Sequence, residues 1–396
     1  MVDASAAAGT AGELLLDPKN ITVADGGGAA VIDGDAYADG GGTNSITIDP
    51  ASIEAIVSVG TGVTLQANND ITISDAIVST GSGVMTFEAG RSIAVDGAIQ
   101  TNNSHIFFSF NDPDATALYR DAGAASFVNN ALINAGTGSV YITAGNTTDN
   151  NAANVTTGIV YADDLRITHS ETDAGGVVTL NGITINDDLI INASTGDVDI
   201  LNTTANGSIR VVGNTQLTTG GDVSILGTNT DLEDFGVTAN NVALYDKKAI
   251  ELGSPGFVSN IAGTLTLDIY GPIGNQGEIN VAGKTTITTY DGGFGIDESN
   301  ITLNNSLNDF GEVSITQDWT GNSVVIDDEN DLDLDGTFRG DLTVDAGGAV
   351  QVEGTVGDDL WIYAGGGMTD SAALSVVDEM HLWAENDTDI VFDETG

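Results

Sequence analysis

The sequence contains no cysteine and only 5 prolines in 396 residues. Without cysteine, disulfides, thiol catalysis and cysteine-based metal sites are all excluded. No linker rich in proline or serine divides the chain, so the composition marks no boundary between domains. No apolar run reaches the roughly 18 residues that a transmembrane helix requires, and we therefore expect no membrane span.

Basic residues are also scarce. The chain has 9 Lys and Arg against 58 Asp and Glu, which gives a formal net charge of -49 at pH 7. A phosphate backbone or an anionic lipid surface attracts basic proteins, so neither nucleic acid nor membrane is expected as a partner. The acidity keeps the chain soluble, or it indicates that the chain binds Ca²⁺ or works in a high-salt habitat. Calcium and salt would each relieve the repulsion among the carboxylates.

The amino terminus lacks the features of a signal peptide, because Met1–Asp3 has no basic start and no apolar core follows it. The carboxyl terminus, Phe392–Gly396, comes directly after a strand-like run. We expect both ends to be cuts within a longer or processed polypeptide.

Strand and turn formers dominate what is present. Glycine occurs 52 times, Asn, Thr, Asp and Val are abundant, and several strong helix formers are rare. Short alternating runs recur between Gly, Asn and Asp residues, for example Ile71–Ile73, Met85–Ala89, Leu189–Ile191 and Leu342–Val344. This pattern predicts short β-strands with one buried face.

The alternating runs recur roughly every 20 residues, which is the spacing of repeat architectures. The sequence therefore predicts a single all-β domain over residues 1–396, an elongated parallel β-solenoid with coils of about 20 residues. An array of β-sandwiches is the competing fold, but it would group strands into blocks of about 100 residues, and no such blocks are visible. Residues 101–137 and Thr228–Phe235 interrupt the pattern and are predicted loop excursions, the first with a short helix.

Three segments carry strings that are typical of a known family. Leu14–Val23 (LLLDPKNITV) is similar to a string common in filamentous-haemagglutinin-like exoproteins, which are β-helical bacterial surface adhesins, and Ala67–Ile73 and Glu88–Ile93 resemble their coil strings. The resemblance is strongest over residues 10–145. It implies a right-handed parallel β-helix, secretion across an outer membrane, and adhesion or filament formation. The Asn-Pro-Asn motifs of that family's secretion domain are absent, so two-partner export is not inferred.

The densest acidic run, Asp327–Gly336, contains the first candidate metal ligands. An EF-hand would need a Glu six residues after its glycine, but Leu342 stands there and no helices flank the run. Leucines alternate with the acids, which indicates a strand with a solvated acidic face, while carboxylates on stacked coils would also suit calcium. Both interpretations stay open, and a Gly-rich loop near residue 35 is a similar case. The candidate calcium ligands are Asp327, Asp331, Asp333, Asp335, Asp33, Asp35 and Asp39.

Catalytic patterns are missing or scattered. Polysaccharide lyases that act on acidic substrates need cations, but the five arginines are spread along the chain, and no Gly-x-Ser-x-Gly elbow is present. A glycosidase needs two carboxylates, and among 58 such a pair cannot be identified from sequence. Each of His105, His169 and His381 is isolated, so packing or surface roles are expected.

Aromatic residues alternate near the carboxyl end. Trp361 and Tyr363 share one predicted strand, and Trp383 follows about one coil later. Such rings either pack in the core or at the end of the rod, or form a sugar-binding face.

These observations predict a non-enzymatic, extracellular protein of the bacterial cell surface that forms or decorates filaments or a biofilm matrix. The expected partners are further copies of the chain, paired end to end with calcium as the cofactor, and a cell-surface glycan or receptor. Two alternatives stay open: a glycan-binding adhesin segment that does not polymerise, and a glycan-active β-helix enzyme.

Overall fold

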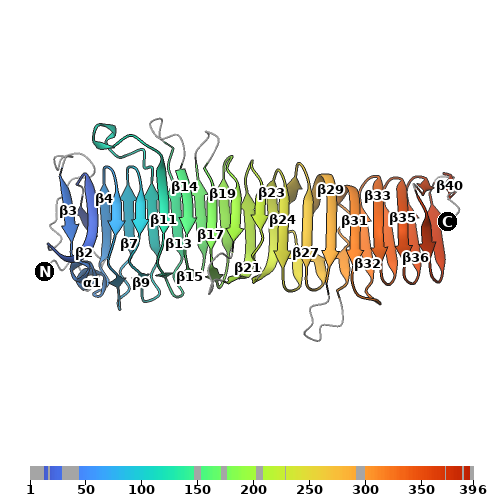
Figure 1. The fold of residues 1–396 in the computed structure, drawn as a ribbon, viewed down its shortest axis with the longest axis horizontal. Helices are drawn as coiled ribbons and strands as arrows, with labels where there is room; N and C mark the ends of the chain where they lie inside the picture. The colour runs from blue at the N-terminus through green and yellow to red at the C-terminus, as the bar shows by residue number, and fades with distance from the viewer. Residues whose placement is uncertain are drawn as a thin grey trace. The chain divides into compact units, whose positions relative to one another are not determined.

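The computed structural model of the chain describes residues 13–16, 18–28, 44–146, 153–170, 176–201, 208–227, 229–290, 299–370, 372–385 and 388–392. Of the residues that the structure describes, strands account for 56% and helices for 3%. The strands pair in parallel and stack as a β-solenoid of about 15 turns, with coils about 22 residues apart (Figure 1). The predicted all-β class, parallel β-solenoid and coil length near 20 residues are therefore confirmed.

The chain divides into two compact units, which are described separately. Unit 1 comprises Met1–Gly213 and Thr218–Gly220, and unit 2 comprises Asn214–Leu217 and Gly221–Gly396. Both contain the same parallel strand pairing, and a single solenoid domain over residues 1–396 stays a prediction.

Unit 1 contains the strands up to β21, except that residues 214–217 of β21 belong to unit 2. The bounds are β1 (Glu13–Leu16), β2 (Asn20–Gly28), β3 (Ser45–Ile48), α1 (Pro50–Val57), β4 (Gly62–Ala67), β5 (Ile71–Ile73), β6 (Ile77–Val78), β7 (Met85–Ala89), β8 (Ile93–Val95), β9 (Ile99–Gln100), β10 (Ile106–Phe110), η1 (Ala117–Tyr119), β11 (Ala125–Asn129), β12 (Ile133–Asn134), β13 (Val140–Ala144), β14 (Ala153–Thr157), β15 (Val160–Ala162), β16 (Leu165–His169), β17 (Val178–Asn181), β18 (Ile183–Ile185), β19 (Leu189–Ala193), β20 (Val198–Leu201) and β21 (Ile209–Thr218).

Unit 2 contains the remaining strands. The bounds are β22 (Val223–Ile225), β23 (Thr230–Ala239), β24 (Val242–Asp246), β25 (Ile250–Leu252), β26 (Ser259–Ile261), β27 (Leu265–Ile269), β28 (Ile273–Asn275), β29 (Ile279–Thr289), β30 (Ile301–Leu303), β31 (Asp309–Gln317), β32 (Val324–Asp328), β33 (Leu332–Phe338), β34 (Leu342–Ala346), β35 (Val350–Val356), β36 (Leu360–Ala364), β37 (Met368–Thr369), β38 (Leu374–Val376), β39 (Met380–Ala384) and β40 (Ile390–Val391).

The period-2 alternation decides which side chains enter the coils of unit 1. Where β4 pairs with β7, Val63 lies beside Met85 and Leu65 beside Phe87, and all four are at most 2% exposed. Apolar residues in successive coils therefore stack on one another and form a continuous core. The ladder through Met85 continues in register at Ile106, Val140, Leu165 and Leu189.

Glycine is needed where the turns of adjacent coils touch. A Cβ atom on Gly97 would lie only 2.4 Å from the backbone of Asp75 in the preceding coil. A larger residue at Gly97 would therefore push the two coils apart, which explains part of the glycine content.

In unit 2 the acidic run folds as its alternation predicts. Leu332 and Leu334 of β33 are at most 1% exposed, while Asp333 and Asp335 face outward. The coils here are shorter, and positions 18 residues apart pair, as at Leu342 and Leu360. Asp333 and Asp335 thus occupy the outer face without interrupting the core.

The predicted excursion over residues 101–137 is narrower in the structure. β10, β11 and β12 lie within that range and pair in register with neighbouring coils. The part between β10 and β11, residues 111–124, lengthens the coil and contains η1. The sequence prediction was too wide because β12 has only two residues, too few to show alternation.

The lengthened coil is fixed to its neighbours by side-chain amides. Asn68 Oδ1 accepts a hydrogen bond from the Thr116 N–H at 2.9 Å, and Asn69 Oδ1 accepts one from the Asp121 N–H at 2.9 Å. Lys19 Nζ lies 2.8 Å from Asp121 Oδ1, and this hydrogen-bonded ion pair lowers the pKa of Asp121.

The predicted loop at Thr228–Phe235 is wrong for the described residues from Thr230 onward, because they form the start of β23. Leu232 and Phe235 are buried there, while Glu233 is exposed. The two acidic residues beside Leu232 gave the segment the composition of a loop, although they are simply the outward positions of a strand.

The α-helix α1 has eight residues and closes a turn between β3 and β4. The Asp49 carboxylate accepts the Ala51 N–H at 2.9 Å, which satisfies a free donor at the first turn. Ile53 and Val57 of α1 are buried. In the part of the chain that the structure describes, no helix is long and apolar enough to span a membrane.

Candidate functional site

Four predicted calcium ligands lie in the acidic run of unit 2, but on different strands. Asp327 faces outward from β32 beside Asp345, whereas Asp333 and Asp335 face outward from β33. Burial, together with the charge of Asp345, raises the pKa of Asp327. Asp331 precedes β33. Within the described residues, no group of three carboxylates with oxygens inside 4.8 Å of one another includes any of these four.

Asp333 Oδ1 accepts the side-chain N–H of Gln351 at 3.3 Å, and two more of these carboxylates are engaged by neighbouring coils. Asp331 Oδ1 accepts the backbone N–H of Ala349 at 2.6 Å. Asp335 Oδ2 accepts the Ser314 hydroxyl at 2.7 Å, and Asp335 Oδ1 lies 3.3 Å from Lys284 Nζ. These contacts account for the orientation of both side chains without an ion.

The other three predicted ligands, Asp33, Asp35 and Asp39, lie outside the described residues. Calcium binding at the seven residues therefore stays a prediction.

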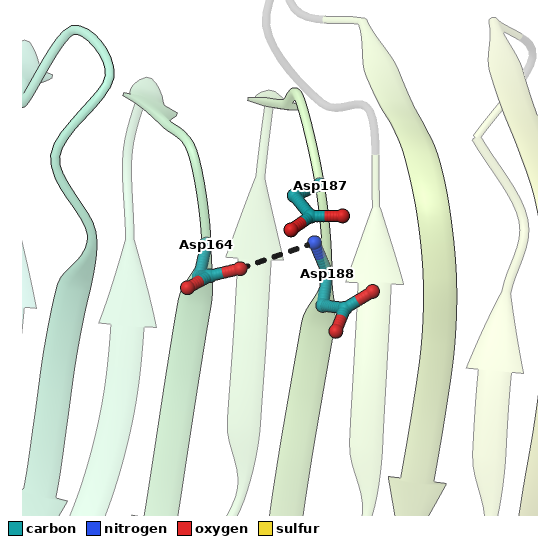
Figure 2. Close-up of side chains that lie close together, drawn as sticks. All are labelled: Asp164, Asp187 and Asp188. Atoms are coloured by element: carbon teal, nitrogen blue, oxygen red, sulfur yellow. Dashed lines mark hydrogen bonds between the residues drawn. The ribbon is translucent and has the colours of Figure 1, made fainter.

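The structure brings three other carboxylates together in unit 1. Asp164 immediately precedes β16, and Asp187 and Asp188 lie in the equivalent turn before β19, one coil later (Figure 2). Oxygen atoms of the three side chains lie within 4.8 Å of one another. Carboxylates at this separation suit a hard cation such as Ca²⁺.

Hydrogen bonds and charges around these three residues are well defined. Asp164 Oδ1 accepts the Asp188 N–H at 3.4 Å, drawn in Figure 2, and Asp164 Oδ2 accepts the Ser139 hydroxyl at 3.0 Å. Arg166 Nη2 lies 3.7 Å from the same Asp164 oxygen. The charge of Asp188, followed by burial and the charge of Asp164, raises the pKa of Asp187.

A second group of the same kind lies in unit 2. Asp358 and Asp359 precede β36, Asp378 lies in the turn before β39, and their oxygens again lie within 4.8 Å. Desolvation and the charges of Asp341, Asp359 and Asp378 raise the pKa of Asp358. In each group, repulsion thus makes one aspartate, Asp187 or Asp358, hold its proton more tightly than an isolated aspartate does.

Both groups belong to a repeated hydrogen bond between a side chain and the backbone of the next coil, which we call the pre-strand ladder. In it, the residue just before a strand accepts, through a side-chain oxygen, the N–H of the equivalent residue in the next coil. Within unit 2, Asp341 accepts from Asp359 at 3.3 Å, and Asp359 accepts from Glu379 at 3.0 Å. Asparagine makes the same contact at Asn241, which accepts from Thr264 at 2.9 Å, and at Asn300, which accepts from Ser323 at 2.9 Å.

The pre-strand ladder explains why carboxylates gather in these turns. Each ladder residue satisfies a turn N–H that the strand pairing does not reach. Since Asp and Asn both serve, the acidic groups have a structural cause whether or not they hold a cation.

Neither group was predicted, although the sequence contains a signal for both. Asp-Asp pairs stand directly before strands at Asp163-Asp164, Asp187-Asp188 and Asp358-Asp359. Aligning the coils on their first buried residue would have placed Asp164 and Asp188 side by side. The calcium ligands were predicted in the longest acidic run instead, but the residues of that run are spread over two strands.

Two carboxylates lie inside the coils of unit 2, at the ends of β24 and β32. Asp246, at 0% exposure, accepts the backbone N–H groups of Leu232 and Lys248 at 2.9 and 2.8 Å. Burial dominates over these two hydrogen bonds and raises the pKa of Asp246 to about 7.

Asp328 repeats this arrangement at 3% exposure. It accepts the backbone N–H groups of Phe310 and Asn330 at 2.7 and 2.8 Å. Burial raises the pKa of Asp328 to about 6. The alternation of β24 and β32 places both aspartates at inward positions, which is the sequence signal that sets them apart from the exposed ones.

The histidines have contacts of the packing kind that their isolation predicted. His105 Nδ1 accepts the Ser139 N–H at 2.9 Å. His169 is 3% exposed, and its Nε2 contacts the carbonyl oxygen of Ala153. His381 stacks on a tryptophan of β36.

The aromatic residues near the carboxyl end face outward rather than into the core. Trp361 and Tyr363 of β36 are 47% and 41% exposed, and Trp383 of β39 is 65% exposed. Of the two interpretations drawn from the sequence, packing in the core is therefore wrong for these rings.

A family model described as "Repeats of unknown function (DUF5649)" matches residues 239–317 and 321–356. These segments run from the end of β23 to the end of β35 in unit 2. No curated protein matches the chain. The similarity to a repeat family and the solenoid fold together fit a β-helical repeat protein.

Proposed function

We propose that this chain is an extracellular structural and adhesive β-solenoid that forms or decorates filaments or a matrix on the bacterial cell surface. One observation carries the proposal: strand after strand pairs in parallel register with the next coil in both units. Such pairing makes a stiff scaffold whose outer faces can carry binding groups at regular intervals. The proposed role is non-catalytic.

The resemblance of Leu14–Val23 and of two coil strings to filamentous-haemagglutinin-like exoproteins supports the extracellular location. The similarity of unit 2 to a repeat family fits the same type of protein. A net charge of -49 keeps such a surface soluble and opposes contact between copies at low salt.

End-to-end association of copies is the proposed assembly step. In such a contact, a strand of one copy would continue the parallel pairing of the other. Calcium, bound where carboxylates converge at Asp164, Asp187 and Asp188 or at Asp358, Asp359 and Asp378, would lower the repulsion between copies.

The test is electron microscopy of the purified chain at low salt, with calcium and with a chelator. We expect uniform fibres with calcium and short single particles with chelator. Magnesium and high sodium chloride are the controls, because screening alone would make them as effective as calcium. Single particles under every condition would contradict filament formation and leave the chain as a segment of a longer adhesin.

A second candidate function, a glycan-binding adhesin segment that does not polymerise, is favoured by the exposed rings of β36 and β39. A glycan-active enzyme is the third candidate, and turnover lost on removing one carboxylate pair would support it.

A further inference from the structure

Four rings form a two-by-two array on the outer surface of unit 2, which we call the aromatic patch: Trp361, Tyr363, His381 and Trp383. In the parallel pairing of β36 with β39, Trp361 lies beside His381 and Tyr363 beside Trp383. The ring centroids are 3.8 Å apart in the first pair and 6.4 Å in the second, with planes within 17° and 10° of parallel. Within each pair, the two rings therefore present nearly parallel planes from adjacent coils.

The exposure of the aromatic patch distinguishes it from other stacked rings on the outer faces. Phe107 and Tyr141 stack at 4.7 Å in unit 1, and Tyr270 and Tyr290 stack at 4.7 Å in unit 2, but all four are half-buried. Trp361 and Tyr363, in contrast, lie on β36, which pairs with a coil on each side, and they still expose 47% and 41% of their surface. Exposed tryptophans held in a fixed geometry are typical of binding surfaces.

A hollow of about 660 Å³ lies over the aromatic patch. Thr343 and Asp345 of β34 line it together with the rings. Its volume is in the range of small-molecule sites, and its walls combine apolar ring faces with a few polar groups.

The polar groups around the hollow are mainly acceptors. Asp345 lies beside Tyr363 in the parallel pairing, and the Tyr363 hydroxyl donates a hydrogen bond to Glu385 Oε1 at 2.6 Å. Glu379 Oε2 lies 3.0 Å from His381 Nε2. The residues that line the hollow include no Lys or Arg. A ligand here must offer hydroxyl donors and a flat apolar face, and must carry no negative charge.

We propose that the aromatic patch binds an uncharged polysaccharide. The C–H faces of sugar rings would stack on Trp361 and Trp383, and sugar hydroxyls would donate to the carboxylates of Asp345 and Glu385. Anionic polysaccharides are disfavoured by the same carboxylates. A second copy of the chain is a poorer occupant, because two such patches would bring like charges together. The inference rests on the adhesive part of the proposed function and requires no filament.

The test is native gel electrophoresis of the chain in gels that contain a soluble polysaccharide. Neutral polymers (galactomannan, xyloglucan and mixed-linkage β-glucan) are compared with anionic ones (alginate and polygalacturonate). We expect at least one neutral polymer to retard the chain and the anionic ones not to. Loss of affinity of about tenfold or more is expected for Trp383→Ala and for Trp361→Ala. Tyr363→Phe, which keeps the ring and removes one hydroxyl, should lose less.

Trp319→Ala is the matched control, because Trp319 is a 50% exposed tryptophan of the same unit outside the aromatic patch. It should bind as the unchanged chain does. Circular dichroism verifies the fold of each variant, and if Trp361→Ala unfolds, the more exposed Trp383 still decides the question.

No retardation by any neutral polymer, retardation unchanged in Trp383→Ala, or preference for the anionic polymers would each overturn the proposal. So would a patch variant that changes only the sedimentation of the free chain, which would identify the aromatic patch as a contact between copies. Absence of fibres in the microscope would leave this result unaffected.

Discussion

The two units differ at the last inward position of some of their strands. In unit 1 this position is hydrocarbon on several strands: Ala67, Ala89, Phe110, Ala144 and Ala193. In unit 2 it is also hydrocarbon on β34 and β36, which end at Ala346 and Ala364, but β24 and β32 place the buried carboxyls of Asp246 and Asp328 there. Each carboxyl accepts two backbone N–H groups. The coil thus tolerates hydrocarbon or a carboxyl at this position, provided that the N–H donors of the turn are satisfied. We therefore expect the stability of unit 2 to depend on pH and that of unit 1 to depend on the volume of its buried side chains.

The largest expected effect concerns the apolar core of unit 1. Phe108 is 1% exposed and packs against Phe87 and Phe127, with ring centroids 5.2 and 4.9 Å apart. Phe108→Ala should lower the free energy of unfolding by about 3–5 kcal/mol through lost burial and a cavity. Urea unfolding, followed by hydrogen exchange in β7 and β10, measures it.

Phe107→Ala is the control on the same strand, since Phe107 faces outward and is half-buried. A clearly smaller loss is expected there. Equal losses for Phe107 and Phe108 would mean that volume inside the coil is not what stabilises unit 1.

The next effect is the pH dependence of unit 2. Asp246 and Asp328 have pKa values of about 7 and about 6 in the folded chain, against about 3.9 when unfolded. The folded state therefore binds these protons more tightly, so their stabilising contribution is complete below about pH 4 and is lost as pH rises through 6 and 7. Hydrogen exchange in β24 and β32 should be slower at pH 5 than at pH 7.5, after correction for the intrinsic rate.

A variant with Asp246→Asn and Asp328→Asn separates these two groups from the general relief of repulsion. Asparagine keeps an acceptor and does not titrate, so the pH dependence of β24 and β32 should flatten, while that of β16 in unit 1 stays as it was. An unchanged slope in unit 2 would show that its pH response comes from the surface carboxylates.

The smallest effect on stability is expected at the pre-strand ladder. Asp359→Asn keeps a side-chain oxygen that accepts the Glu379 N–H, as the side chains of Asn241 and Asn300 do in other coils. The free energy of unfolding should therefore change by less than about 0.5 kcal/mol. If Asp358, Asp359 and Asp378 also bind calcium, the same variant should weaken calcium binding in isothermal titration calorimetry. Thus one substitution tests the structural and the metal-binding roles independently, and a large loss of stability without calcium would contradict the equivalence of Asp and Asn.

Local alternation carried most of what could be predicted. It identified Leu332 and Leu334 as inward and the acids between them as outward, because a strand shows its two faces in successive residues. It failed at β23, where acids beside Leu232 looked like a loop, and at β12, which is too short to alternate. The carboxylate groups at Asp164 and Asp358 were missed because their members come from different coils.

The sequence by itself determined the solenoid: apolar residues at every second position, glycine and asparagine at the turns, and a repeat near 20 residues leave few other ways to bury the core. Only the tertiary structure decided which side chains meet. A coil brings together residues about 22 positions apart, and insertions such as 111–124 change that interval from coil to coil. That stacking buries Asp246, gathers three carboxylates around Asp164, and places Trp361 beside His381 in the aromatic patch.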